Sequence, residues 1–231
     1  MAASLDGQTE KAKADETVQT APFSLADANV GDMRTAKTTM VAANDLQITG
    51  TNDSATPATR QERLQEFVDG FGHLGKLYSD SVGDQARFSK FQDRMMNVYT
   101  YDHATFKEIG RLGDDMTKNP PPTPEQIGQA LGHSLKNTMD RQLKTGNVDL
   151  ASPDMINLEG AMAGVMLAAR ATFNPNTKDA QTTAMVDAME AELRKQNVPH
   201  IHAIIWGDTK EPGLAVVAPG QQVGDRHNFN Q

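Results

Sequence analysis

The sequence of 231 residues contains no cysteine. Without thiols the protein cannot form disulfides, use a cysteine nucleophile or bind zinc through cysteine. Aromatic residues are scarce at 5%, and hydrophobic residues other than glycine make up 38%. No apolar run is long enough for a membrane span, and the N-terminus (MAASLDGQTEKAK) lacks the apolar centre of a signal peptide. We therefore expect no membrane span and no Sec-type export, which leaves the cytoplasm, a virion or Sec-independent secretion open.

Basic residues are fewer than acidic residues. The chain has 22 basic and 30 acidic residues, for a formal net charge of −8. Phosphate backbones are bound by clustered lysine and arginine, whereas the basic residues of this chain are scattered along it. Nucleic acid is therefore not expected as the main ligand, and the partner we expect is a protein, either another one or a second copy of the chain.

Residues 1–57 differ in composition from the rest of the chain. They hold one aromatic residue, Phe23, and four basic against eight acidic residues, so that their net charge of −4 is half of the total. A segment with so few large apolar side chains cannot bury enough surface to offset the entropy lost on ordering. We predict a flexible, disordered acidic arm over 1–57 and a flexible polar tail over 219–231.

Helix signals fill the region from residue 58 to residue 196. Thr123 and Gln126 flank a proline in the pattern of a capping box, Thr59 and Glu62 repeat the pattern, and Ser152 precedes another proline. Apolar residues follow these starts with the three-to-four-residue spacing of a buried helix face. The pattern predicts six helices, over about 59–80, 84–99, 103–117, 124–144, 153–173 and 177–196.

The predicted helix 153–173 is the most apolar of the six. It combines large residues such as Leu158 and Met162 with small ones such as Ala161 and Gly164 around most of its circumference. A helix that is apolar or small on most sides is typical of the centre of a fold. Nine of the methionines fall in the predicted helices, mostly in phase with leucine, isoleucine and valine, which favours a core over a binding groove.

After residue 196 the pattern changes from helix to strand. Residues 200–206 and 214–218 are rich in β-branched and aliphatic side chains, and the segment 207–213 between them has the polar composition of a turn. The sequence therefore predicts a mainly α fold in which residues 58–218 form a domain of five or six helices with a C-terminal β-hairpin.

The hairpin also carries the candidate interaction residues. Alternation along a strand places Ile201, Ala203 and Ile205 on one face and His200, His202, Ile204 and Trp206 on the other. One face is expected to pack on the helices and the other to meet a protein partner. Two histidines on one face could instead begin a metal site, but no further ligand stands at a suitable spacing, so we assign no metal ligand.

Catalytic signatures are not recognisable in the sequence. Gly70, Gly72 and Gly75 have the spacing of a dinucleotide-binding loop, but they lie inside a helical pattern with no strand before it. The run of prolines over 119–122 is interpreted as a stiff linker between helices. We assign no catalytic or cofactor-binding residues and expect no cofactor.

These observations favour a non-enzymatic interaction or assembly protein. One such protein would be a self-assembling coat or virion subunit whose arm and hairpin reach its neighbours. A bacterial type III secretion effector that acts on host proteins, with an export signal in the arm, is an alternative. An enzyme whose site is assembled only by folding is a further alternative.

Overall fold

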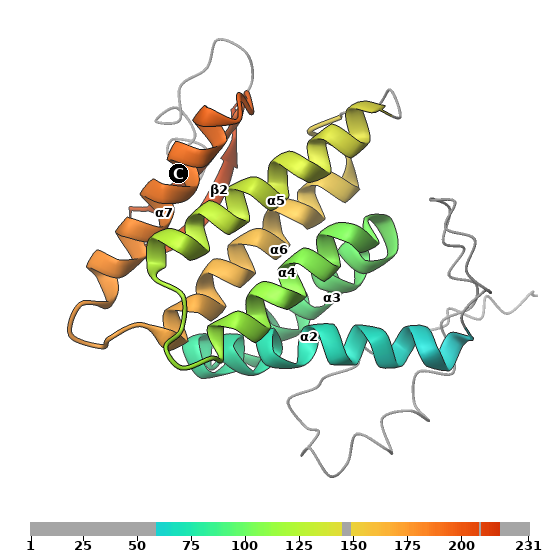
Figure 1. Cartoon of the computed structure of the whole chain (residues 1–231), viewed down its shortest axis with the longest axis horizontal. Helices are drawn as coiled ribbons and strands as arrows, with labels where there is room; N and C mark the ends of the chain where they lie inside the picture. The colour runs from blue at the N-terminus through green and yellow to red at the C-terminus, as the bar shows by residue number, and fades with distance from the viewer. Residues whose placement is uncertain (1–58, 145–148, 208, 218–231) are drawn as a thin grey trace, which may run out of the picture.

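The computed structural model describes residues 59–144, 149–207 and 209–217, and it confirms a mainly helical domain with a C-terminal hairpin (Figure 1). The elements, labelled as in Figure 1, are α2 (Arg60–Val82), α3 (Gln85–Tyr101), α4 (His103–Met116), α5 (Pro124–Lys144), α6 (Pro153–Ala169), a 3₁₀ turn (Arg170–Thr172), α7 (Lys178–Lys195), β1 (Ile201–Trp206) and β2 (Glu211–Val216). The predicted flexible arm over 1–57 and tail over 219–231 lie outside the described residues.

The predicted helix starts are confirmed by the hydrogen bonds at the caps. The hydroxyl of Thr59 accepts from the backbone N–H of Glu62, whose carboxylate accepts from the N–H of Thr59. Thr123 and Gln126 form the same reciprocal pair at the start of α5. The Ser152 hydroxyl caps α6 by accepting a hydrogen bond from the backbone N–H of Met155. These bonds satisfy backbone donors that have no partner inside the helix.

Helix α6 is the centre of the fold, as predicted. It runs through the middle of the bundle and contacts α2, α3 and β2 (Figure 1). Leu158, Ala161 and Met162 have 0% exposure, and a Cβ at Gly164 would lie 2.1 Å from the ring of Phe91 on α3. The α-helix ends at Ala169, four residues before the predicted end, because the chain tightens there into the 3₁₀ turn.

Methionines and aromatic side chains form the rest of the core. Eight of the nine methionines in the helices are no more than 6% exposed, which confirms their interpretation as core residues. The rings of α2, α3 and α4 meet in one cluster, with ring centroids 5.4 Å apart for Phe67 and Phe106 and 4.5 Å apart for Tyr78 and Phe91. Such contacts stabilise a helix interface beyond the burial of area.

Helices α5 and α7 approach each other through two glycines. A Cβ at Gly128 would lie 2.0 Å from the carbonyl oxygen of Met185, and one at Gly132 would lie 2.9 Å from Glu192 Cβ. The four-residue spacing places both glycines on the same face of α5. The backbones of the two helices therefore meet at a distance that no larger residue allows.

The hairpin differs from its predicted boundaries. β2 begins at Glu211, so Pro212 and Gly213 belong to the strand and not to the turn. Pro212 lies opposite Ile205 on β1. Two residues before Ile205, the N–H of Ala203 points away from β2 and donates to a side chain of α7. Because the N–H groups of residues two apart on a strand point the same way, Ile205 and the residue opposite it form a pair without ladder hydrogen bonds. The missing N–H of Pro212 therefore costs the hairpin no hydrogen bond.

A change of Gly128 to alanine should destabilise the protein by about 1–3 kcal/mol, because the new methyl group would overlap the backbone of α7. Gly72→Ala is the matched control, since a Cβ there has no neighbour within 4 Å among the described residues. That variant should be more stable than the wild type by about 0.5–1 kcal/mol. Urea denaturation of both variants measures the difference, and equal stabilities would contradict the close α5–α7 contact.

Candidate interaction site

The hairpin is attached to α7 through the carboxylate of Glu190. Its Oε1 lies 3.0 Å from His202 Nδ1, and its Oε2 accepts a 2.9 Å hydrogen bond from the backbone N–H of Ala203. Arg194, one turn further along α7, donates to the same carboxylate at 2.9 Å. Glu190 thus accepts a hydrogen bond from a backbone N–H on the outer edge of β1, and this N–H would otherwise be free to pair with another strand.

The electrostatics of Glu190 follow from these contacts. Burial raises the pKa of the Glu190 carboxyl, but the hydrogen bonds from His202, the Ala203 N–H and Arg194 outweigh burial and hold the pKa below its usual value. The ionised carboxylate is therefore the form that the folded state favours.

A second ion pair attaches the start of β2 to α3. The two guanidinium nitrogens Nη1 and Nη2 of Arg87 donate to Oε1 and Oε2 of Glu211, each at 2.9 Å. This bidentate geometry fixes orientation as well as distance. Because 124 residues separate the partners, no local pattern in the sequence could have indicated the pair.

The predicted interaction residues do not all lie within the strand β1. His200 precedes β1 and has a left-handed backbone, with φ of 67°, so the alternation assumed for it in the sequence analysis was wrong. His202, Ile204 and Trp206 do alternate along β1, and all three are partly exposed. A Cβ at Gly213 would lie 2.4 Å from Trp206 Nε1, which shows that the indole lies across this glycine on β2.

The opposite face of the hairpin belongs to the core. Ile201, Ala203 and Leu214 are 1%, 7% and 8% exposed and are part of the same apolar cluster as the helices. The prediction that one face packs on the helices is therefore confirmed. We define the hairpin face as His202, Ile204 and Trp206, the partly exposed side of β1.

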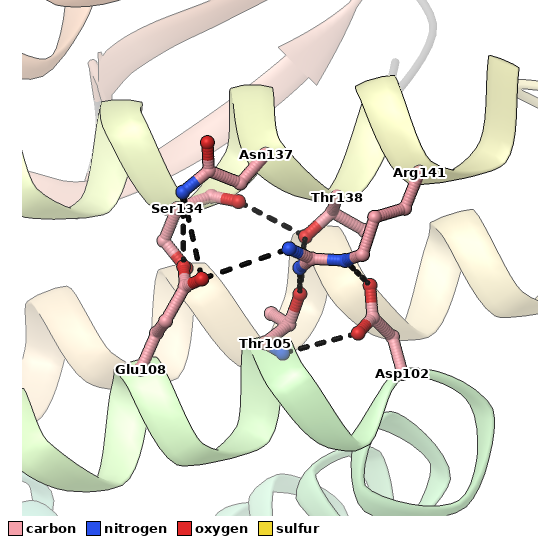
Figure 2. Close-up of polar contacts among 7 residues, drawn as sticks. All are labelled: Asp102, Thr105, Glu108, Ser134, Asn137, Thr138 and Arg141. Atoms are coloured by element: carbon pink, nitrogen blue, oxygen red, sulfur yellow. Dashed lines mark hydrogen bonds and ion pairs between the residues drawn. The ribbon is translucent and has the colours of Figure 1, made fainter. Parts of the chain in front are cut away.

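A polar network joins α4 to α5 at some distance from the hairpin (Figure 2). Asp102 begins α4 by accepting from the N–H of Thr105 at 3.1 Å, and its second oxygen accepts from Arg141 Nε at 2.9 Å. Arg141 also donates to the Thr105 hydroxyl, which in turn shares a short hydrogen bond with Thr138. On the other side of Arg141, Glu108 Oε1 lies 3.6 Å from Nη1. We call this network the Arg141 clasp.

The Arg141 clasp is arranged to hold helices together. Asp102 is both the C-cap of α3 and the N-cap of α4. By binding Asp102, Arg141 on α5 fixes the corner between α3 and α4. The Thr105 and Thr138 hydroxyls bond to each other, to Arg141 and to the backbone carbonyl of Ser134. The sequence analysis did not single out Arg141, because its partners Asp102 and Thr105 lie more than thirty residues away along the chain.

Two adjoining surface grooves run along α4 and α5. Their volumes are about 700 and 370 Å³, and both are lined by Leu112, Ala130 and His133. Charges of both signs stand at the rim of the larger groove, with Asp115 and Lys195 among them. Charged residues of both signs therefore border an otherwise partly apolar groove.

The glycines with the spacing of a dinucleotide-binding loop are placed inside a helix. Gly70, Gly72 and Gly75 lie within the continuous helix α2, where Gly70 allows α4 to approach. Across the described part of the chain, no three histidine or acidic residues gather into a possible metal site. No helix of that part is long and apolar enough to cross a bilayer.

Comparisons of the chain with protein-family models, with curated proteins and with solved structures give no match.

Replacing Arg141 with methionine should lower the free energy of unfolding by about 1.5–3 kcal/mol, because the Asp102 carboxylate, only 9% exposed, loses its charged donor. Arg141→Lys should recover part of this loss, since lysine keeps the charge but not the forked geometry. Lys90→Met, at an exposed site on α3, is the control and should change stability by less than about 0.5 kcal/mol. Guanidinium denaturation compares the three variants, and a neutral Arg141→Met would contradict the role of the clasp.

The stabilisation that Glu190 contributes should depend on pH. Because its pKa is lowered in the folded state, the contribution is present above the ordinary value of 4.5 and is lost as the pH falls through the folded value. We expect Glu190→Gln to have a lower Tm than the wild type at pH 7. The difference should shrink below pH 4.5. Thermal denaturation between pH 3 and pH 8 tests this, and a difference that grows in acid would refute it.

Proposed function

We propose that this protein is a non-enzymatic assembly subunit that binds further copies of itself and uses the hairpin face as one contact surface. One observation carries the proposal. Glu190 and Arg87 hold the hairpin on the helical body from two sides, while Ile204 and Trp206 remain partly exposed on its other side.

A hairpin held in this way is suited to binding. An isolated two-stranded hairpin is marginally stable in water, whereas this one is fixed by core packing and by two charged contacts. A surface that is already ordered loses less entropy on association. Tryptophan is enriched among the residues that dominate the energy of protein interfaces, and Trp206 is the single tryptophan of the chain.

The non-enzymatic part of the proposal is supported by the use of polar groups in the fold. The carboxylates of Asp102 and Glu190, and the guanidinium groups of Arg87 and Arg141, each connect two elements of the structure. Groups that hold elements together in this way are positioned for stability and not for contact with a substrate.

A coat or virion subunit is one setting that fits this proposal. An effector exported from a bacterium and acting on host proteins is the alternative setting, and the two differ in the behaviour of the purified protein. A coat subunit should associate with itself, whereas a monomer would favour the effector.

The mass of the full-length protein in solution tests the proposal. We expect light scattering after size exclusion to give at least twice the chain mass of 25.0 kDa at micromolar concentrations. Ile204→Asp should lower this mass because it places a charge on the hairpin face. Ile156→Asp, the same substitution at a side chain on α6 that is 53% exposed, is the matched control and should leave the mass unchanged. A wild-type protein that stays at 25.0 kDa would refute self-association.

A further inference from the structure

Helix α4 carries a stripe of alternating charge on its exposed side. Its members are Glu108, Arg111, Asp115 and Lys118, two of them exposed and two partly exposed. Spacings of three, four and three residues place all four on one face, because 3.6 residues complete a helical turn. Lys118 lies just beyond the end of the helix and is held beside Asp115 by an ion pair. We call this stripe the α4 face.

The signs of the α4 face read negative, positive, negative, positive from Glu108 to Lys118. The reverse order gives the opposite sign at every position. A second copy of the helix that runs antiparallel, related by a two-fold axis near Gly113, therefore places Glu108 opposite Lys118 and Arg111 opposite Asp115. Each of these pairs occurs twice across such an axis, as in an isologous interface.

A parallel alignment of the same stripe in register would set like charges against each other, which is unfavourable. The charge pattern thus selects both the partner and its direction. It does so without any change in the fold, because Glu108, Arg111 and Asp115 project from a helix that the core and the Arg141 clasp hold in place. Lys118, beyond the end of that helix, is held beside Asp115 by their ion pair.

Two further features of the α4 face suit this arrangement. Arg111 is exposed and forms no ion pair or hydrogen bond with any residue in the described part of the chain, so its charge is available to a partner. Beside the stripe lie the two grooves that share Leu112, Ala130 and His133. These grooves provide space for side chains of an approaching copy next to the charged contacts.

We propose that the α4 face is a two-fold, antiparallel interface between two copies of this chain. This inference rests on the proposed self-association and identifies a surface for it other than the hairpin face. A closed two-fold contact through α4, together with a second contact through the hairpin, would allow dimers to join into larger assemblies.

Charge reversal on the full-length chain tests this interface. Arg111→Glu alone and Asp115→Arg alone each set like charges against each other twice, and each should weaken self-association about tenfold or more. An equimolar mixture of the two variants restores opposite charges at both contacts, so the mixture should associate as the wild type does. The double variant should likewise recover association with itself. Sedimentation velocity measures all four samples.

Controls separate this pairing from a general effect of charge. Lys90→Glu and Asp187→Arg make the same changes of net charge at exposed sites on α3 and α7 and should leave association unchanged. Lys118→Glu is a second variant on the stripe and should weaken association as Arg111→Glu does. Far-UV circular dichroism confirms that each variant is folded, and raising the salt concentration should weaken the wild-type contact because exposed charges are screened.

The outcomes distinguish this inference from the proposed function. If the wild type associates but the single reversals associate equally well, or if the mixture fails to recover, the α4 interface is wrong while self-association stands. If the wild type remains a monomer at every concentration, the proposed function itself fails and the interface fails with it.

Discussion

Close packing around α6 is the constraint on which the rest of this structure depends. A helix that contacts α2, α3 and β2 at once has little room for bulky side chains on every side, and positions such as Gly164 and Ala161 give the neighbouring helices that room. The ring of Phe91 occupies the space above Gly164, and through this ring the aromatic cluster of α2 to α4 is fixed against the centre. Close packing of this kind leaves few degrees of freedom to the outer elements.

The elements on the outside are then placed by a small number of charged contacts. Arg141 fixes the corner between α3 and α4, Arg87 holds the start of β2, and Glu190 occupies an edge of β1. Each contact joins residues of two different elements. The two faces to which we assign function, on the hairpin and on α4, lie on elements stabilised in this way, so both are ordered before any partner binds.

Much of the fold could be predicted from the sequence because its signals are local. Capping residues such as Thr123 and Ser152 define where helices begin, and the apolar spacing in 153–173 indicates a central helix. The boundaries of β2 were missed because Pro212 is normally a turn residue, and it is compatible with a strand only where its missing N–H faces away from the partner. The left-handed backbone of His200 had no signal in the sequence.

The candidate sites were harder to predict, for a different reason. The alternation along β1 predicted that Ile204 and Trp206 share a face, and both are partly exposed. The contacts of Glu190 and Arg87 that hold the hairpin join residues distant in sequence. The glycines of α5 could have been noticed through their four-residue spacing, yet only folding shows that α7 lies against them. The charge pattern of α4 is visible in the sequence, but its exposure is decided by packing.

The central claim is that an ordered helical body associates through surfaces already formed in the single chain. Hydrogen–deuterium exchange of the full-length protein at low and high concentration tests this claim most directly. We expect exchange to slow with concentration in peptides from β1 and α4, while the amides of α6 exchange slowly at every concentration. Exchange that is independent of concentration throughout the described part of the chain would contradict it.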